Sequence, residues 1–495
     1  MRVSLLFCFA LSLSSVSSAE VPNFVIINID DLGYADIGPF GSTLNRTPNL
    51  DRMAKEGRRL TCFYAAPVCS PSRSSLMTGC YPKRVLPIPN VLFPASAVGL
   101  NPDESTVAEL LKSAGYNTGC IGKWHLGDQP PFLPTRQGFD YYLGLPYSND
   151  MGTAEDGAKS SLGESPAGSP KKPPAKVKKG PAKAASPKKA AVAETGLTGA
   201  DQPPLPLLEN EKVIARVRQG EQAGIVERYT AAAEKFLEAN HGKPFFLYLA
   251  HTAVHFPLYP GREFQHKSTN GLYGDWVEEV DWSVGRVFDK LRELHLDGNT
   301  FVLFTSDNGG TPRSVNRPLR GFKGSTWEGG MRVPTIAWWP GKIPAGTSCD
   351  AVSGMMDVLP TLVKLAGGTL PADRKIDGGD LWPLLTDQPD AKPLHEVFYF
   401  YRGLQLEAVR SGPWKLHLAQ GELYQLEKDV AESENVAGSH ADVVAKLREL
   451  AADADKDLGV TGVGPGCRPL GRVPSPRPLI DRDGTVRDGF AAPSP

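Results

Sequence analysis

The sequence of 495 residues predicts an α/β protein in which helices flank one large mixed sheet, followed by a smaller antiparallel sheet with a helix. Three short apolar runs, at 23–29, 244–250 and 300–305, alternate with helical stretches, as in sheets buried on both faces. From residue 394 onward the pattern changes to short β runs and then one helix, which is typical of a small α+β unit.

Composition and charge limit the class of protein. With 41% hydrophobic and 22% charged residues, the chain is an ordinary globular one with a large core. The formal net charge of -1 argues against nucleic-acid binding. Residues 1–19 have a basic end, a short apolar run and small residues before Glu20, the pattern of a secretory signal. We therefore expect a secreted, periplasmic or otherwise exported protein, without a membrane span because no later apolar run approaches about 20 residues.

The chain divides into a predicted catalytic domain at 20–392, a small α+β subdomain at 393–463 and an irregular tail at 464–495. Residues 152–200 are rich in Ala, Pro, Gly, Ser and Lys, a composition that buries too little apolar surface to fold. We interpret them as a disordered insertion. It is either a solvated tether without function or a basic arm that holds a polyanionic substrate nearby.

Local patterns predict further elements in order. Residues 47–57 have Pro near the start, apolar residues at helical spacing and a final glycine. Thr106 and Glu109 form a capping-box pattern for a helix over 105–114, and a strand follows at 117–121. Longer helices are expected over 221–240 and 273–294, then a strand at 335–339 and a short helix at 357–366.

Polar residues follow the ends of the three buried strands, where open α/β sheets place their ligands. Asp30 and Asp31 follow the first strand, His255 follows the second, and Asp307 and Asn308 follow the third. Carboxylate and amide oxygens suit calcium or magnesium better than zinc. Because Gly33 is close, a helix cap or turn is the alternative for the two adjacent aspartates.

Two basic segments favour an anion pocket. Lys123 and His125 lie two residues apart between glycines and share one side if the chain is extended. A structural role is the alternative for this histidine. Lys323 lies in a Gly-rich loop over 320–334.

The most informative stretch is 67–84, PVCSPSRSSLMTGCYPKR. Its core, Cys69 to Arg73, has the form C-x-P-S-R, and Met-Thr-Gly follows at 77–79. A buried free thiol in a loop is the alternative. The stretch resembles the signature of the type I sulfatases, and the resemblance is closest to the arylsulfatase A group. It extends from residue 23 to about 435, with further matches at 47–51, 122–127, 144–150 and 323–332.

The resemblance implies an alkaline-phosphatase-like fold, and a maturation enzyme that oxidises Cys69 to formylglycine. It also implies one calcium ion, bound by residue 69 together with Asp30, Asp31, Asp307 and Asn308. Arg73 and Lys123 would hold the formylglycine hydrate, and His125 would contact its second hydroxyl. The residues implied to surround the sulfate are Lys123, Lys323, His255 and Ser148.

The implied reaction is a displacement at sulfur. One hydroxyl of the hydrate attacks, His255 or Lys323 assists the departing alcohol, and a covalent sulfate ester forms on residue 69. His125 then takes the proton of the second hydroxyl, and sulfate leaves as the carbonyl re-forms. A serine would not suffice, because its sulfate ester has no second hydroxyl.

Some features depart from the family or leave alternatives open. Val430 replaces a usual proline, and the spacing from His251 to His255 is one residue longer than in the arylsulfatase A group. Zinc phosphohydrolases usually have histidine where Asn308 stands.

The leading function is an exported hydrolase of a sulfated small molecule or glycan. The alternatives are a phosphonate or phosphodiester hydrolase using the same formylglycine, and a noncatalytic binder of sulfated glycans.

Five cysteines remain besides Cys8 and Cys69, an odd number that leaves disulfide pairing open: Cys62, Cys80, Cys120, Cys349 and Cys467.

Overall fold

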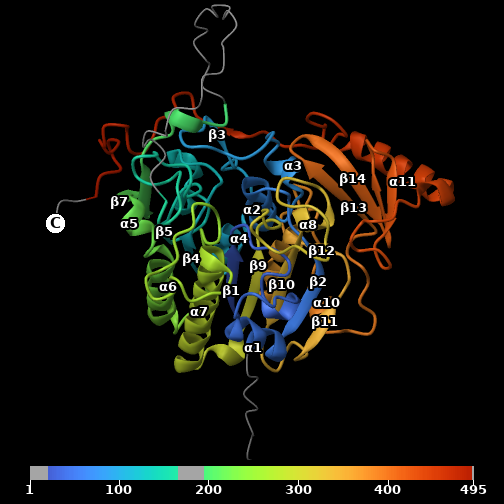
Figure 1. Ribbon diagram of the computed structural model, residues 1–495, viewed down its shortest axis with the longest axis horizontal. Helices are drawn as coiled ribbons and strands as arrows, with labels where there is room; N and C mark the ends of the chain where they lie inside the picture. The colour runs from blue at the N-terminus through green and yellow to red at the C-terminus, as the bar shows by residue number, and fades with distance from the viewer. Residues whose placement is uncertain (1–20, 165–193, 493–495) are drawn as a thin grey trace, which may run out of the picture.

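The computed structural model describes residues 21–164 and 194–492; the predicted leader at 1–19 and the middle of the predicted insertion lie outside the described residues. The described chain forms a mixed sheet of eleven strands, with a second, smaller sheet at the C-terminal side (Figure 1). In sheet order the strands are β11 (Thr347–Cys349), β2 (Arg58–Tyr64), β10 (Arg332–Trp338), β9 (Thr300–Ser306), β1 (Asn23–Ile29), β8 (Phe245–Ala250), β4 (Asn117–Gly122), β5 (Tyr141–Gly144), β6 (Leu205–Glu209) and β7 (Lys212–Val217), while β12 (Ser353–Gly354) pairs with β2.

The centre of the sheet is parallel and buried on both faces. Strand β1 lies between β8 and β9 and pairs with both in parallel, as the three apolar runs predicted. Alternate residues of β1 enter different cores: Val25 packs toward the helices α1 (Pro48–Glu56), α6 (Ile225–Asn240) and α7 (Gly271–Glu293). Phe24 packs toward the helices α2 (Cys69–Thr78), α4 (Val107–Ser113) and α9 (Val358–Leu365). Helices therefore cover both faces.

Local signals placed most helices within a few residues. The capping box of α4 is formed, because Glu109 N donates to Thr106 Oγ1 at 3.1 Å and Thr106 N donates to Glu109 Oε2 at 2.9 Å. The helix predicted over 221–240 is divided at Gly224 into a short α5 (Gln219–Gln222) and α6. The remaining short helices are α3 (Pro82–Val85), α8 (Glu328–Met331) and α10 (Trp382–Leu385).

The bounds predicted for the disordered insertion were too wide. Residues 152–164 and 194–200 are described as turns and a short 3-10 helix, and they pack on the domain. Asp156 is buried and forms an ion pair with Arg216 on β7 at 2.8 Å. Composition alone missed this packing, because it depends on partners far along the chain. The hairpin of β6 and β7 then extends the sheet at this edge.

The small antiparallel sheet predicted near the C-terminus is present. It has the order β13 (Val397–Arg402), β14 (Gln405–Ser411), β15 (Trp414–His417) and β16 (Glu422–Gln425), and α11 (Ala441–Asp453) packs on it. The sheet shares a hydrophobic core with Tyr64, Met331 and Met356 of the large domain. This contact joins the two units.

The described part of the tail, up to residue 492, is mostly irregular but packs against the large domain. Strand β17 (Gly471–Arg472) pairs with β3 (Val98–Gly99), and Leu479, Ile480 and Phe490 are buried in the main core. The six described cysteines are free thiols. No helix in the described ranges is both long and apolar enough to cross a membrane.

Candidate active site

The carboxyl ends of neighbouring strands bring the candidate residues to one edge of the sheet. The polar residues follow the carboxyl ends of their strands within a few residues, so the site is built on the rigid centre of the fold. These residues are Asp30 and Asp31 after β1, Lys123 and His125 after β4, Ser148 after β5, His255 after β8, and Asp307 and Asn308 after β9.

Cys69 lies at the first position of α2 and faces this edge. Its Sγ lies 3.3 Å from Asp30 Oδ1 and 3.5 Å from Lys323 Nζ, and only 2% of the residue is exposed. Burial, with a further contribution from the nearby Asp30 carboxylate, raises the pKa of the Cys69 thiol well above its usual range. An unmodified Cys69 is therefore a neutral thiol and a poor nucleophile.

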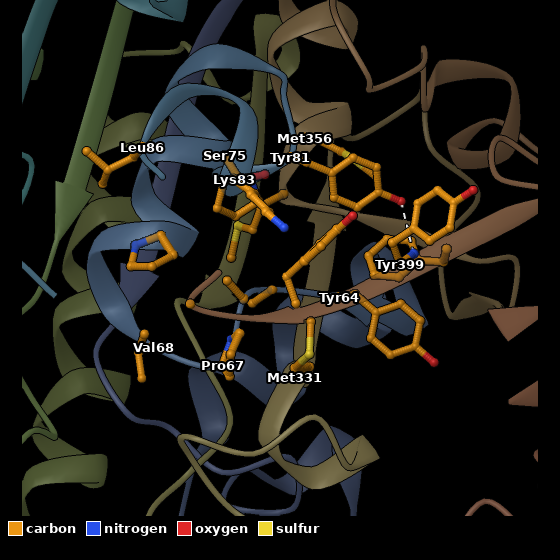
Figure 2. A pocket seen from close by; sticks show the side chains of 18 of the residues that line it. Tyr64, Pro67, Val68, Ser75, Tyr81, Lys83, Leu86, Met331, Met356 and Tyr399 are labelled. Carbon is orange, nitrogen blue, oxygen red and sulfur yellow. Dashed lines mark hydrogen bonds between the residues drawn. The ribbon is translucent and has the colours of Figure 1, made fainter. Parts of the chain in front are cut away.

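The far side of α2 is held by the C-terminal subdomain. A small pocket there is lined by Pro67, Val68 and Ser75 on one side and by aromatic residues including Tyr81 and Tyr399 on the other (Figure 2). The amide of Tyr399 donates to Tyr81 Oη at 3.1 Å. The helix that carries Cys69 therefore faces the C-terminal subdomain across this pocket.

Each basic group of the site is paired with a carboxylate. Arg73 lies one helical turn after Cys69, and its guanidinium forms an ion pair with Asp307 at 2.8 Å. Lys123 Nζ lies 2.5 Å from Asp30 Oδ2, and Lys323 Nζ lies 2.5 Å from Asp31 Oδ1. The three cations balance the three carboxylates, so a bound divalent cation would leave the site positive and suited to an anion.

The ion pairs keep these groups charged despite their burial. Burial alone would raise the pKa of Asp30, but Lys123, His255 and Arg73 hold it well below its usual range. Burial alone would lower the pKa of Lys323, but the carboxylate of Asp31 raises it well above its usual range. The site is therefore a fixed array of charges.

His125 presents one free ring nitrogen to the interior of the site. Its Nε2 lies 2.8 Å from the carbonyl oxygen of Leu92, so this nitrogen carries the proton, and its Nδ1 is buried without a hydrogen-bond partner. Burial and then the charges of Lys123 and Arg73 hold the pKa of His125 well below its usual range. Nδ1 is consequently an unprotonated acceptor.

Of the two histidines after β8, His255 lies in the site. Its Nδ1 lies 2.5 Å from the Phe256 carbonyl oxygen and 3.2 Å from Ser148 Oγ, while its Nε2 lies 3.7 Å from Asp31 Oδ2. His251 is fully buried, and its Nε2 lies 3.1 Å from Ser283 Oγ of α7. The longer spacing between the two histidines therefore leaves the second one at the sheet edge.

Three of the residues expected around a cation, Asp30, Asp31 and Cys69, lie together with His255, whereas Asp307 is outside this group and pairs with Arg73. One ligand atom from each of Asp30, Asp31, Cys69 and His255 falls within 4.8 Å of the others. Asn308 Nδ2 donates to Asp31 Oδ1 at 2.8 Å, which leaves Asn308 Oδ1 buried and without a partner. An orphaned amide oxygen beside carboxylates fits a hard divalent cation.

Sequence reasoning missed two groups that border the site. The Leu92 carbonyl fixes the tautomer of His125, and no side-chain signal marks a backbone acceptor. Asp150 Oδ1 lies 4.0 Å from His255 Nδ1. The sequence offered one signal for Asp150, because this residue lies two positions after the predicted site residue Ser148.

The chain is similar to known proteins over most of its length. Bovine (Bos taurus) arylsulfatase A is 39% identical over 428 residues, covering 83% of this chain and 78% of the relative. Mouse (Mus musculus) N-acetylgalactosamine-6-sulfatase is 36% identical over 443 residues, covering 84% and 75%. The crystal structure of Ps i-CgsB is 30% identical and superimposes with a TM-score of 0.71, covering 88% of this chain and 93% of that one.

The fold and the charged edge of the sheet define a hydrolase of anionic esters with an alkaline-phosphatase-like architecture. The sulfatase family model matches residues 22–368, and a model described as N-sulphoglucosamine sulphohydrolase, C-terminal, matches residues 323–457. The chain therefore belongs to the type I sulfatase family, in the arylsulfatase A group, and is a hydrolase of sulfuric esters.

Proposed function

We propose that this sulfatase works with formylglycine made from Cys69 and with one calcium ion, on a sulfated small molecule or sulfated glycan. The observation that carries the proposal is the neutral thiol of Cys69 between Asp30 and Lys323. Sulfate-ester cleavage there needs an oxygen nucleophile, which oxidation of this cysteine by a maturation enzyme provides. When present, the hydrated aldehyde supplies that nucleophile, and calcium supplies positive charge that stabilises its anionic form.

The residues that would hold the cation are Asp30, Asp31, Asp307 and Asn308, together with residue 69. Their oxygen donors and the orphaned Asn308 Oδ1 support calcium over zinc.

The basic side chains bind and orient the sulfate. Lys123 and Lys323 are charged and directed to the same edge as Cys69, and Arg73 lies behind them. Their fixed positive charges stabilise the negative charge that develops on the sulfuryl oxygens in the transition state. Ser148 and His255 complete this pocket.

Two histidines and one lysine move protons. His255 or Lys323 gives a proton to the departing alcohol oxygen, since both side chains are partly exposed, at 13% and 19%. His125 accepts a proton at Nδ1 when sulfate is expelled, because its Nε2 is already occupied by the Leu92 carbonyl.

We also propose export, on the pattern of residues 1–19, which lie outside the described residues. A phosphonate or phosphodiester hydrolase with the same formylglycine remains the second candidate, because sulfuryl and phosphoryl groups are both tetrahedral oxyanions.

The first test combines the mass of the peptide containing residue 69 with hydrolysis of an aryl sulfate and a matched phosphonate. The protein is produced with a formylglycine-generating system. We expect conversion of the thiol to the aldehyde and release of sulfate, and no turnover in Cys69→Ser. Full activity of Cys69→Ser would refute the formylglycine proposal. An aldehyde with phosphonate turnover alone would favour the second candidate, and an aldehyde that turns over neither substrate would favour a narrow sulfated glycan as the substrate.

A further inference from the structure

The mouth of the site is formed by three partly exposed side chains. His255 is 13% exposed, Lys323 19% and Asp150 32%, whereas the side chains of Arg73 and Lys123 are fully buried. A sulfate that reaches the buried cations must therefore leave the rest of the substrate beside these three residues. Two of them have roles in the proposed reaction, and Asp150 has none.

Asp150 differs from the other carboxylates of the site because no cation pairs with it. Asp30, Asp31 and Asp307 each have a lysine or arginine within 2.8 Å. His255 Nδ1 lies 4.0 Å from Asp150 Oδ1, but that nitrogen already lies 2.5 Å from the Phe256 carbonyl oxygen, and the nearby Lys159 ammonium binds the backbone carbonyl of Asp150. Asp150 Oδ1 is buried and has no hydrogen-bond partner in the described chain. Because 32% of the side chain is exposed at the mouth, a substrate group that reaches this carboxylate can supply the missing donor.

The backbone holds Asp150 in this position independently of its side chain. The ammonium group of Lys159 donates to the Asp150 carbonyl oxygen and, at 2.5 Å, to Gln202 Oε1. Met151 N donates to Ser148 O at 3.0 Å, and Asn149 Nδ2 donates to Pro257 O at 3.2 Å, next to the His255 loop. The carboxylate is thus presented on a fixed turn, which favours a binding role.

The charge of Asp150 decides which part of the substrate it contacts. A carboxylate repels the sulfuryl oxygens, so it faces the alcohol side, next to the histidine that serves the departing oxygen. Its free oxygen requires a donor, and a hydroxyl group of a sugar provides one. A phenol offers no such hydroxyl, so an aryl sulfate gains no hydrogen bond to offset the negative charge of Asp150 near its departing oxygen.

We infer that Asp150 accepts a hydrogen bond from a hydroxyl neighbouring the sulfated position, and thereby selects sulfated sugars over aryl sulfates. This inference rests on the proposed function, and it makes Asp150 a specificity residue.

The test compares matured wild type, Asp150→Ala and Asp150→Asn on 4-nitrophenyl sulfate and on a panel of monosulfated hexoses and N-acetylhexosamines. For the best sugar, analogues with one hydroxyl replaced by fluorine are added, because fluorine cannot donate. We expect wild type to lose about 10- to 100-fold in kcat/KM on one analogue, the range for a hydrogen bond to a charged group. In Asp150→Ala, kcat/KM on the parent sugar falls by the same factor, and replacing the hydroxyl by fluorine lowers it no further. Its kcat/KM on the aryl sulfate rises about threefold, because an unpaired negative charge is removed.

Glu155→Ala is the matched control, since Glu155 is an exposed acid five residues away, and its rates on both substrates stay at wild-type values. If Asp150→Ala does not fold, Asp150→Asn retains the shape and one acceptor, and an intermediate loss on the sugar is expected. The inference would be overturned if the losses in kcat/KM caused by the variant and by the analogue multiply, because the two changes would then act independently. It would also be overturned if Asp150→Ala lost as much kcat/KM on the aryl sulfate as on the sugar. A wild type that cleaves the aryl sulfate but no sugar would overturn it while leaving the proposed function intact.

Discussion

His125 is distinguished at the residue scale by a free Nδ1 that faces a cluster of fixed charges. Its Nε2 is held by the Leu92 carbonyl at 2.8 Å, and the positive charges of Lys123 and Arg73 disfavour a second proton on the ring. The imidazole is therefore a proton acceptor with a fixed tautomer at the start of each turnover. This state suits a base that acts late in the reaction, after the alcohol has left.

We predict that His125→Ala lowers kcat about 100- to 1000-fold, the usual range for loss of one acid or base, and lowers KM with it, so that kcat/KM changes little. About one equivalent of alcohol per site should still be released rapidly before the slow phase, because the lost proton transfer follows that release. Rapid-mixing measurements of the alcohol test this prediction. His241→Ala, at an exposed position, is the control. A full rate or a missing first equivalent would assign the proton transfer elsewhere.

Asn308 carries a second prediction at this scale, because its Oδ1 is buried without a partner. Calcium should raise the thermal midpoint of chelator-treated protein and restore its turnover, and zinc should do so poorly. At a concentration 100 times Kd, binding stabilises the fold by about 2.7 kcal/mol. In Asn308→Ala the calcium-dependent shift should shrink, whereas Asn90→Ala, at an exposed position, keeps it. Equal shifts in both variants would place the ion elsewhere.

Residue types at strand ends were sufficient to predict that Asp30, Asp31, His255, Asp307 and Asn308 lie at one edge of the sheet, whereas Ser148 was expected there only from the family resemblance. The pairing of Lys323 with Asp31 was not predictable, because it depends on how a loop of the β9 to β10 connection folds back. The same limit applies to Asp150, whose role emerges only from its distance to His255 and its missing cation.

At the element scale, the loop that carries Lys323 is attached to the C-terminal sheet by a buried charge network. Lys415 on β15 lies 2.8 Å from Glu328 of α8 and 3.0 Å from Glu432, and all three side chains are fully buried. Glu432 also accepts a hydrogen bond from the amide of Glu328 at 2.7 Å. The subdomain therefore supports the catalytic loop as well as covering the domain.

We predict that Lys415→Met destabilises the protein by about 3–5 kcal/mol, because two buried carboxylates lose their partner. Lys428→Met, at an exposed position of the same subdomain, should have little effect. The pKa of Glu328, which burial would raise, is lowered to about 2 mainly by Lys415. Its stabilising contribution is present above the unfolded pKa of about 4.5 and disappears as the pH falls toward 2. Denaturant unfolding from pH 7 to pH 3 should show a smaller acid-dependent loss in Lys415→Met than in wild type.

Elements with strong local signals were predictable, and elements that depend on distant partners were not. The capping box of α4 and the apolar runs of β1, β8 and β9 are local, and all four were expected. The hairpin of β6 and β7 was missed because its strands acquire their register only beside β5.

On the scale of the whole molecule, the tail also combines a predictable local feature with contacts to distant partners that were not predictable. Its Pro- and Gly-rich composition predicted irregular structure, and the described part is largely irregular, yet it is anchored in the main core. Leu479, Ile480 and Phe490 are 0%, 1% and 7% exposed. Arg487 Nη1 also donates to Gln129 Oε1 at 2.9 Å, close to the segment that follows His125.

We predict that ending the chain at residue 477 lowers the thermal midpoint by several degrees. Three buried apolar side chains are removed, each worth about 1.5–3 kcal/mol, and the core surface beneath them is exposed. The charged edge of the sheet is left in place, so turnover per folded molecule at low temperature should stay within about threefold of wild type. Calorimetry and low-temperature assays measure the two effects separately. Removal of residues 493–495 alone is the control, and a midpoint equal to that control would mean that the tail does not support the core.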